Sequence, residues 1–257
     1  MMELNGRPAD PDALATLALT NYGHFTTMRV DDGRVRGLGL HMERLAGTCR
    51  ALFGAELDTD RVRAYLVRAV PATGSLVVRV TVFDPSLDLG HPSAAADPHV
   101  LVTTRPAGAP TAPPFRVRTV PYVRDTPALK NVGLFGLLRA RREAQLAGFD
   151  DALFVGPDGR VSEGGTWNVA FVDGAGTVVW PEADVLPGIT MALVRRDDHA
   201  LAKVTTADLP SMRAAFATNA AVGVRAVAAV DDVALDPGHP VVAALQEAYA
   251  ALRGEPV

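Results

Sequence analysis

The alternation of apolar and polar positions near the start of the chain predicts a β-hairpin. Residues 25–30 are rich in β-forming types, Asp31-Asp32-Gly33 is a turn sequence, and residues 34–40 are expected to form the second strand. Apolar residues then recur at helical spacing as far as Phe53, where Gly54 provides a stop. The elements predicted after the hairpin are a helix over 42–53, a helix over 58–69 and a strand over 75–83.

The second half of the chain also mixes strand and helix patterns. Turn residues over 156–159 separate two β-rich runs, and an apolar helical face runs from Val241 to Leu252. The predicted elements are strands over 115–122, 152–155 and 161–172, and helices over 132–147, 188–201 and 241–252. Because strands and helices follow one another without a regular βαβ rhythm, the pattern favours an α+β fold over a doubly wound parallel sheet.

A proline-rich stretch divides the chain into two predicted domains. Four of the nine residues from Pro106 to Pro114 are proline, and such a segment cannot join a central strand or a helix. It is interpreted as a semi-rigid linker over 106–114. The predicted domains are a smaller N-terminal α+β domain over 1–108 and a larger C-terminal domain over 115–257.

Composition argues against several classes of function. The formal net charge is −4 and the 25 Lys and Arg residues are scattered, so no nucleic-acid partner is expected. The start lacks a basic region followed by an apolar core, and no apolar run approaches the ~20 residues of a membrane helix, so neither a signal peptide nor a membrane partner is expected. Cys49 is the single cysteine, which fits a reducing cytoplasmic compartment, and its place on an apolar helical stripe indicates core packing. The histidines are dispersed, so no metal site is expected.

Four features of the sequence could together bind one cofactor: a lysine, a glutamate, a glycine turn and an arginine. Lys130 offers an amine that can form an imine with an aldehyde, and Glu163 offers a carboxylate. The run Leu-Pro-Gly-Ile-Thr over 186–190 would bring backbone N–H groups to a helix start, which suits a phosphate. Arg44 is available as a cationic clamp. Together these groups match the needs of pyridoxal phosphate, whose ring nitrogen must stay protonated to accept electrons.

These residues lie within three longer stretches that together span nearly the whole chain. The first runs from Phe-Thr-Thr-Met-Arg-Val at residue 25 to His-Met-Glu-Arg-Leu at 41–45, and the second from Leu-Lys-Asn at 129 to Trp-Asn at 167–168. The third contains 186–190 and the later run Phe-Ala-Thr-Asn-Ala over 216–220. These stretches resemble the fold-type IV pyridoxal-phosphate enzymes, the class IV aminotransferase family. It includes branched-chain and D-amino acid aminotransferases and aminodeoxychorismate lyase.

The resemblance implies a two-domain α+β fold like that of D-amino acid aminotransferase. It also implies that pyridoxal 5'-phosphate binds in the cleft between the domains, and that the protein is a homodimer with the site near its interface. The expected partner is a small-molecule amine or amino acid substrate.

The resemblance also implies a role for each matching residue. Lys130 would form the imine and move protons, Glu163 would face the pyridine nitrogen, and Arg44 would bind the phosphate. Asn168 is expected to support the loop that carries Glu163 more than to touch the cofactor, and His41 is expected to be structural. The residues expected to complete the cofactor pocket are Gly188, Ile189, Thr190, Asn219 and Ala220.

Two features favour the lyase within this family. Phe25-Thr26-Thr27 stands where aminotransferases commonly carry Phe-Glu, and Thr218-Asn219-Ala220 stands where they more often have threonine in place of Ala220. The hydroxyl of Thr26 or Thr27 is expected to deliver a proton as pyruvate leaves. The arginines predicted to bind a substrate carboxylate, which a guanidinium matches in a bidentate way, are Arg29, Arg79 and Arg124.

Other features depart from the family pattern and leave three functions open. The Asp-Arg-Gly signature is missing from residues 15–21, Phe83-Asp84-Pro85 replaces the Arg-Gly carboxylate loop, and the segment 86–98 is unusually long. The lead hypothesis is a 4-amino-4-deoxychorismate lyase of folate biosynthesis, which releases pyruvate and 4-aminobenzoate. The alternatives are an aminotransferase of the branched-chain or D-amino acid type, and a non-catalytic relative that keeps the fold.

Overall fold

Residues 1–109 and 112–257 are described by the computed structural model, in which the chain folds into two units. Unit 1 comprises Met1–Gly108, Leu129–Gly133 and Arg253–Val257, and unit 2 comprises Ala109–Ala128 and Leu134–Leu252. The domain ranges predicted from the sequence are continuous, whereas unit 1 takes in two short segments from further along the chain. Pro110 and Thr111 of the predicted linker lie outside the described residues.

Unit 1 is built on an antiparallel sheet with the strand order β16-β4-β3-β5-β6-β1-β2. Its strands are β1 (Met2–Leu4), β2 (Arg7–Pro8), β3 (His24–Asp31), β4 (Arg34–Val35), β5 (Ser75–Phe83), β6 (His99–Pro106) and β16 (Glu255–Pro256). Strands β3 and β5 pair along the whole of β3, from His24 opposite Val82 to Asp31 opposite Ser75. This register decides which side chains share a face of the sheet.

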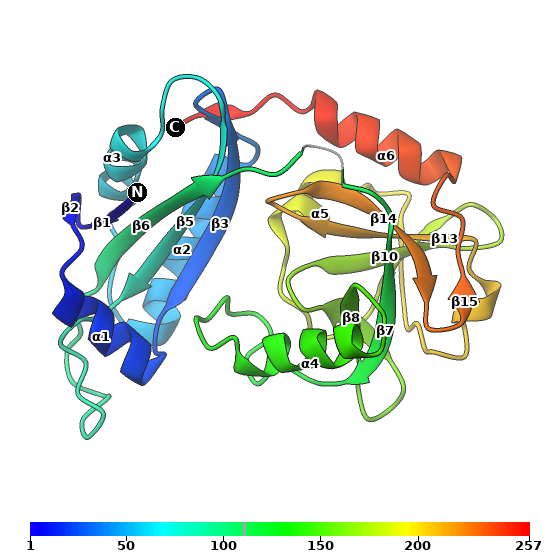
Figure 1. Ribbon diagram of the computed structural model, residues 1–257, viewed down its shortest axis with the longest axis horizontal. Helices are drawn as coiled ribbons and strands as arrows, with labels where there is room; N and C mark the ends of the chain where they lie inside the picture. Colours follow the sequence, from blue (N-terminus) through cyan, green and yellow to red (C-terminus); the bar gives the residue numbers. More distant parts are fainter. Residues whose placement is uncertain (110–111) are drawn as a thin grey trace. The chain divides into compact units, whose positions relative to one another are not determined.

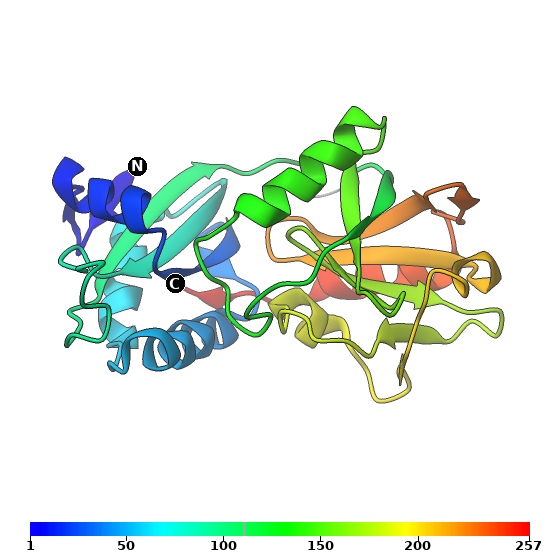
Figure 2. The same ribbon diagram turned by 90° about the horizontal axis from the view of Figure 1, so that it is seen from below.

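Helices pack on both faces of this sheet. They are α1 (Pro11–Thr20), α2 (Leu38–Phe53) and α3 (Thr59–Ala69). Helices α2 and α3 bury the face that carries Met28 and Val30, and α1 packs on the opposite face against Phe83 and Leu101. Figure 2 shows α1 and α2 on opposite sides of the strands. Polar side chains on this second face include Thr27, Arg79 and Arg105.

Unit 2 is built on a sheet that closes into a barrel. The path β10-β13-β14-β7-β8-β9 returns to β10 because Asn168 pairs with Glu163, and β11 and β12 continue outward from β10. Its strands are β7 (Phe115–Pro121), β8 (Asp151–Val155), β9 (Val161–Gly164), β10 (Asn168–Val172), β11 (Val178–Pro181), β12 (Ala200–Ala202), β13 (Ala214–Asn219), β14 (Gly223–Val230) and β15 (Val233–Ala234). Strand β7 is parallel to both of its neighbours, β14 and β8.

The helices of unit 2 pack against this barrel (Figure 1). They are α4 (Phe135–Leu146), α5 (Ile189–Val194) and α6 (Pro240–Ala251), together with a short 3-10 turn over Leu209–Ser211. Alternate residues of β10 enter two different cores: Val169 and Phe171 join one, and Ala170 and Val172 join the one beneath α5 and α6. Helix α4 packs on β7 and β8. None of the helices in the described residues has the length and apolar character needed to cross a membrane.

Several predicted elements are confirmed by the structure. The strand predicted over 75–83 is β5, and the helix predicted over 58–69 is α3, for which the Asp58 carboxylate accepts two backbone N–H bonds as the N-cap. Helix α2 contains the range predicted over 42–53 and ends at Gly54, whose φ of 62° is left-handed as expected for a glycine stop. Helix α6 matches the predicted C-terminal helix.

Three predicted ranges are wrong in their extent. The strand predicted over 34–40 ends at Val35, because Gly37 adopts a φ of 72° and α2 begins at Leu38. The strand predicted over 161–172 is interrupted after Gly164, where the indole of Trp167 packs so closely that no Cβ would fit. The helix predicted over 188–201 stops at Val194, because the following polar run offers nothing to bury, and β12 pairs with β11 instead.

Candidate active site

Lys130 lies in the short segment 129–133 that belongs to unit 1. Its carbonyl accepts a hydrogen bond from the N–H of Phe25 at 2.9 Å, and the N–H of Val132 donates to the carbonyl of Gly23 at 3.0 Å. The segment therefore extends the sheet beside the first residues of β3. Main-chain hydrogen bonds fix the backbone of Lys130 and leave its half-buried side chain to project from a defined point.

The ring of Phe25 contacts two cations in unit 1. The Nζ of Lys130 lies 4.9 Å from the ring centroid, and the guanidinium carbon of Arg79 lies 3.6 Å from it. Phe25 itself is buried, so both cation–π contacts are partly shielded from water. Such contacts are strongest when they are desolvated. Lys130, Phe25 and Arg79 thus come together although they are far apart in the sequence.

Arg44 projects from α2 one turn after His41. Burial lowers the pKa of Arg44 to about 10. The pKa of His41 is lowered to about 3, first by burial and then by the charges of Arg44 and Lys130. Arg44 and Lys130 therefore both lie close enough to the buried imidazole of His41 for their charges to lower its pKa. A partly desolvated guanidinium of this kind gains most from an anion.

The two threonines predicted to be catalytic lie on opposite faces of β3. Thr26 is fully buried, and its Oγ1 lies 2.6 Å from Nδ1 of His41. Thr27 is half-buried on the other face, directly across from Arg79 in β5. Thr26 is therefore engaged with His41, and Thr27 is the hydroxyl that a substrate can reach.

Glu163 and Asn168 face each other across β9 and β10 in unit 2. Glu163 is 3% exposed, and its Oε2 accepts hydrogen bonds from the N–H of Leu186 at 3.3 Å and from Nδ2 of Asn168 at 3.4 Å. Nδ2 of Asn168 also donates to the carbonyl of Leu186 at 2.8 Å. Asn168 thus holds both the carboxylate of Glu163 and the loop that precedes α5.

Arg124 lies beside the same carboxylate. Its Nε is 3.6 Å from Oε1 of Glu163, and the two side chains are 10% and 4% exposed. The pair lines a cavity of about 370 Å³ together with Phe154 and Ser162. This placement engages Arg124 with Glu163, so it is a weaker candidate for a substrate carboxylate than the sequence suggests.

The turn before α5 depends on the close approach of Asn168. A Cβ at Gly188 would lie 1.9 Å from Oδ1 of Asn168, so only glycine fits there. Ile189 and Thr190, the first residues of α5, are both buried. The Asn168 side chain therefore fixes where this helix begins.

Two buried hydroxyls of unit 2 have no hydrogen-bond partner among the described residues. They belong to Thr190 and to Thr218, each 1% exposed. Thr218 pairs with Asn168 across β13 and β10, and Asn168 pairs with Glu163, so these three residues form a row across the sheet. Buried hydroxyls in native proteins almost always have a partner. These two are therefore suited to a ligand with hydrogen-bonding oxygens.

Asn219 shapes the turn between β13 and β14 that carries Ala220. Its Oδ1 accepts hydrogen bonds from the N–H of Ala221 at 3.0 Å and of Val222 at 2.8 Å. The same turn borders a cavity of about 270 Å³. The side chain of Asn219 thus stabilises the turn, and any contact of this turn with a ligand would come from its backbone.

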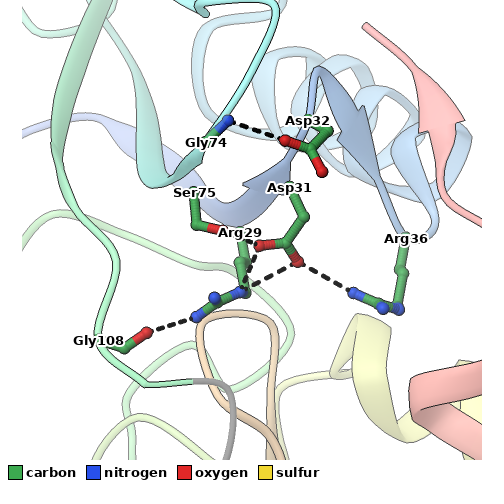
Figure 3. Close-up of polar contacts among 7 residues, drawn as sticks. All are labelled: Arg29, Asp31, Asp32, Arg36, Gly74, Ser75 and Gly108. Carbon is green, nitrogen blue, oxygen red and sulfur yellow. Dashed lines mark hydrogen bonds and ion pairs between the residues drawn. The ribbon is translucent and has the colours of Figure 1, made fainter.

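Arg29 takes part in an ion-pair cluster near the β3–β4 turn (Figure 3). Its Nε donates to both oxygens of Asp31, at 2.9 and 3.1 Å, and its Nη1 donates to the carbonyl of Gly108 at 2.8 Å. Arg36 and Ser75 also donate to Asp31. Arg29 is thereby hydrogen-bonded to Gly108, the last residue of the first segment of unit 1.

Sequence reasoning missed two members of these groups. In the sequence Phe25 stands out only as part of a motif, and Thr218 only as part of a run that distinguishes lyases from aminotransferases. A hydroxyl within the apolar run of residues 214–218 is the signal that could have found Thr218. No local signal identifies Phe25, because its partners come from other parts of the chain.

The family model for amino-transferase class IV matches residues 23–230. The chain belongs to the class IV aminotransferase family. No curated protein matches its sequence.

Solved structures of class IV aminotransferases resemble this chain closely in fold. A branched-chain aminotransferase from Thermoproteus uzoniensis with norvaline has a TM-score of 0.84 at 21% identity, over 97% of this chain and 93% of that one. The PLP-bound form of a hypothetical aminotransferase from Mycobacterium tuberculosis has a TM-score of 0.79 at 20% identity, over 98% of both chains. A Legionella pneumophila protein, named as a candidate 4-amino-4-deoxychorismate lyase, has a TM-score of 0.76 at 23% identity, over 89% of this chain and 90% of that one. The predicted fold-type IV, α+β class is confirmed.

Proposed function

We propose that this class IV aminotransferase binds pyridoxal 5'-phosphate and releases pyruvate and 4-aminobenzoate from 4-amino-4-deoxychorismate. The observation that carries the cofactor is the row of Glu163, Asn168 and Thr218 beside a glycine turn. The reaction type is supported by two lyase-like sequences, Phe25-Thr26-Thr27 and Thr218-Asn219-Ala220.

The described residues fit this cofactor in charge and in hydrogen bonding. The partly buried guanidinium of Arg44 suits the phosphate dianion, and Glu163 offers a carboxylate whose position is fixed by two hydrogen bonds. The buried hydroxyls of Thr190 and Thr218 can bond to its oxygens. Lys130 provides the amine.

In this proposal the chain's own residues divide the work. When bound, the cofactor would supply an aldehyde for the substrate amine and a ring that can take up electrons. The amine of Lys130 accepts the proton from the substrate carbon, which the aromatic product does not keep, and this proton balances the one that the departing group takes up as pyruvate. Glu163 holds a proton at the pyridine nitrogen, and Arg44 orients the phosphate. Thr27, whose hydroxyl lies on the polar face of β3, donates a proton at the departing group.

The second candidate function is amino transfer between an amino acid and a 2-oxo acid. It is favoured by the structural likeness to aminotransferases and by the loss of the Arg-Gly loop at Phe83-Asp84-Pro85. The same residues would serve it, with Lys130 returning the proton to a different atom. For either function we propose a cytoplasmic homodimer, which sedimentation of the purified protein tests.

A pair of assays on one preparation decides between these functions. The purified protein should be yellow, and its absorbance should change when an amine substrate is added. 4-Amino-4-deoxychorismate is supplied in one arm, with pyruvate measured by a coupled assay. L- and D-amino acids with 2-oxoglutarate or pyruvate are supplied in the other arm, with amino transfer measured.

Each outcome has a distinct meaning. Pyruvate release that is lost in Thr27→Val but kept in Thr26→Val supports the lyase and the hydroxyl assigned to it. Amino transfer without pyruvate release would overturn the lyase in favour of the aminotransferase. A colourless protein that takes up no cofactor would establish a non-catalytic relative.

A further inference from the structure

The cavity of about 270 Å³ in unit 2 lies on the face of β13 away from the proposed cofactor site. Ala217 lines this cavity and belongs to the core around Phe171, whereas Phe216 belongs to the core beneath α6. Because successive side chains of a strand point to opposite faces, Thr218 points the same way as Phe216 and away from the cavity. The row that contains Thr218 and Glu163 is therefore on the other side of the sheet.

Two buried aromatic rings line this cavity. Phe115 and Trp167 are 3% and 5% exposed, and they contact each other edge to face with their centroids 5.3 Å apart. Asp151 also lines the cavity, but its carboxylate accepts two hydrogen bonds from Arg141 and one from Nε1 of Trp167. The ion pair of Arg141 and Asp151 is thus satisfied within the protein.

Arg225 brings a second guanidinium to the cavity. Its Nε donates to the carbonyl of Pro113 at 2.6 Å, and its guanidinium carbon lies 4.1 Å from the centroid of the Phe115 ring. Burial lowers the pKa of Arg225, and the charges of Asp150 and Asp151 offset part of this effect. Its Nη1 and Nη2 atoms make no hydrogen bond within the described part of the chain. They form the end of a guanidinium that binds a carboxylate through two parallel hydrogen bonds.

Asp150 brings a carboxylate to the same cavity. Its Oδ2 accepts a hydrogen bond from the N–H of Arg116 at 2.7 Å, while its Oδ1 accepts none from the residues that the structure describes. No direct ion pair joins Asp150 to Arg225 within these residues, although each charge is close enough to act on the other. A cation and an anion thus border one cavity without pairing with each other.

We propose that this cavity binds a small zwitterion of amino acid size, with its carboxylate on Arg225 and its ammonium group on Asp150. A lone anion would also meet the charge of Asp150, and a lone cation would meet that of Arg225, whereas a zwitterion leaves neither charge unpaired. The volume is slightly below the ~300 Å³ at which pockets for drug-sized ligands begin, so the ligand is small. The ligand is an effector rather than the substrate, because Glu163 and Thr218 are on the other face. The inference does not depend on the proposed function.

N,N-Dimethylglycine is the probe that tests the site. It carries one ammonium group and one carboxylate, and its tertiary nitrogen cannot form an imine with an aldehyde. 3-Methylbutanoate has nearly the same shape with only the negative charge, and N,N-dimethylglycinamide keeps only the positive charge. Dissociation constants for all three are measured by NMR titration of the protein as purified. The wild type should bind each control at least ~10-fold more weakly than N,N-dimethylglycine, because one charge-assisted contact is lost.

The two tryptophans of the chain report where the probe binds. Trp167 lines the cavity, whereas Trp180 packs edge to face on Phe216 and its Nε1 donates to Nδ1 of His199 at 3.2 Å. In ¹⁵N-labelled protein, N,N-dimethylglycine should shift the indole N–H signal of Trp167 and leave that of Trp180 unchanged. Trp180→Phe assigns the two signals.

Variants of the two charged groups test their separate roles. Arg225→Leu should weaken binding of N,N-dimethylglycine roughly 10- to 100-fold, and Asp150→Asn by about 3- to 10-fold because this carboxylate is exposed. Arg225→Lys keeps the charge but loses the paired N–H groups, so an intermediate loss is expected, and it decides the matter if Arg225→Leu fails to fold. Arg139, exposed on α4 and paired with Glu143, is the control, and Arg139→Leu should remain within about twofold of the wild type.

Equal affinity for 3-methylbutanoate and N,N-dimethylglycine would overturn the inference, as would an equal loss of affinity in Arg139→Leu and Arg225→Leu. A titration that shifts only the Trp180 signal, or neither signal, would also overturn it. A protein that shows the Trp167 shift but takes up no pyridoxal phosphate would keep this site and overturn the proposed function alone.

Discussion

Unit 1 and unit 2 hold their candidate site residues by different means. In unit 1 the groups are cations, Lys130, Arg44 and Arg79, and the ring of Phe25 contacts two of them, Lys130 and Arg79. In unit 2 the central group is an anion, Glu163, positioned by hydrogen bonds from Asn168 and from a loop N–H. A cation–π contact leaves a charged head some freedom to shift, whereas hydrogen bonds restrict the direction in which a carboxylate points. Unit 1 therefore contributes cations to the candidate site, and unit 2 contributes a buried carboxylate held by hydrogen bonds.

Of the changes to the two units, removal of Lys130 should have the largest effect on cofactor binding and activity. Lys130→Ala should abolish covalent capture of the cofactor, because no other amine stands at that position. After borohydride reduction, peptide mapping should find the cofactor on the peptide containing Lys130 in the wild type and nowhere in the variant. The chain's other lysine, the exposed Lys203, provides the control, since Lys203→Ala should label normally. Label on Lys203 in the wild type would refute the assignment.

Removal of the anion in unit 2 should lower turnover without abolishing cofactor binding. Glu163→Ala is expected to reduce the rate by ~10²-fold or more, because the electron-accepting ring loses its fixed electrostatic partner. Turnover and cofactor absorbance are measured on the same sample. Glu143→Ala, on the exposed surface of α4, should behave as the wild type. Unchanged turnover in Glu163→Ala would show that this carboxylate has another role.

Removal of Arg44, the proposed phosphate ligand in unit 1, should mainly weaken cofactor affinity. A charge-assisted contact contributes on the order of 1.5–3 kcal/mol, so Arg44→Ala should raise the dissociation constant roughly 10- to 100-fold. Titration of the apo-protein with pyridoxal phosphate measures it. Arg50 lies on the same helix but is exposed and paired with Glu56, so Arg50→Ala should have little effect. An unchanged constant in Arg44→Ala would place the phosphate elsewhere.

Burial in unit 1 should also make the protein sensitive to acid. His24 is fully buried, neither ring nitrogen has a partner in the described residues, and burial lowers its pKa to about 4. The unfolded chain takes up a proton near pH 6.5 and the folded protein does not, so stability falls as the pH drops below 6.5 toward 4. The expected contribution of His24 is about 2 kcal/mol between pH 7 and pH 5.

Denaturant unfolding at both pH values tests this expectation. His24→Leu should lose less stability on acidification than the wild type by about that amount. His91→Leu alters an exposed histidine paired with Asp88 and should leave the pH dependence nearly unchanged. If His24→Leu remained as acid-sensitive as the wild type, the buried imidazole would not be the cause.

The sequence predicts parts of this molecule that depend on local patterns. The helix after Asp58 and the strand over 75–83 follow from capping and alternation, which act over a few residues. The faces of Thr26 and Thr27 could also have been predicted. Met28 and Val30 are apolar at the even positions of β3, so the even-numbered Thr26 must face the core.

Other features depend on pairing between distant segments and leave no local signal. Arg29 and Arg79 look equivalent in the sequence, and only the strand register and the presence of Asp31 distinguish them. The split of the range 161–172 arises because Trp167 packs over Gly164. The early end of α5 is decided by the pairing of β12 with β11, which competes with continued helix.

The return of the last residues to unit 1 has a consequence for biosynthesis. Strand β16 pairs with β4, and the carboxylate of Glu255 accepts a hydrogen bond from the N–H of Gly39 near the start of α2. Because domains generally fold as units during synthesis, unit 2, whose last residue is Leu252, can be complete before unit 1. Unit 1 must wait for its final strand until translation has passed β16, although most of its residues are made much earlier.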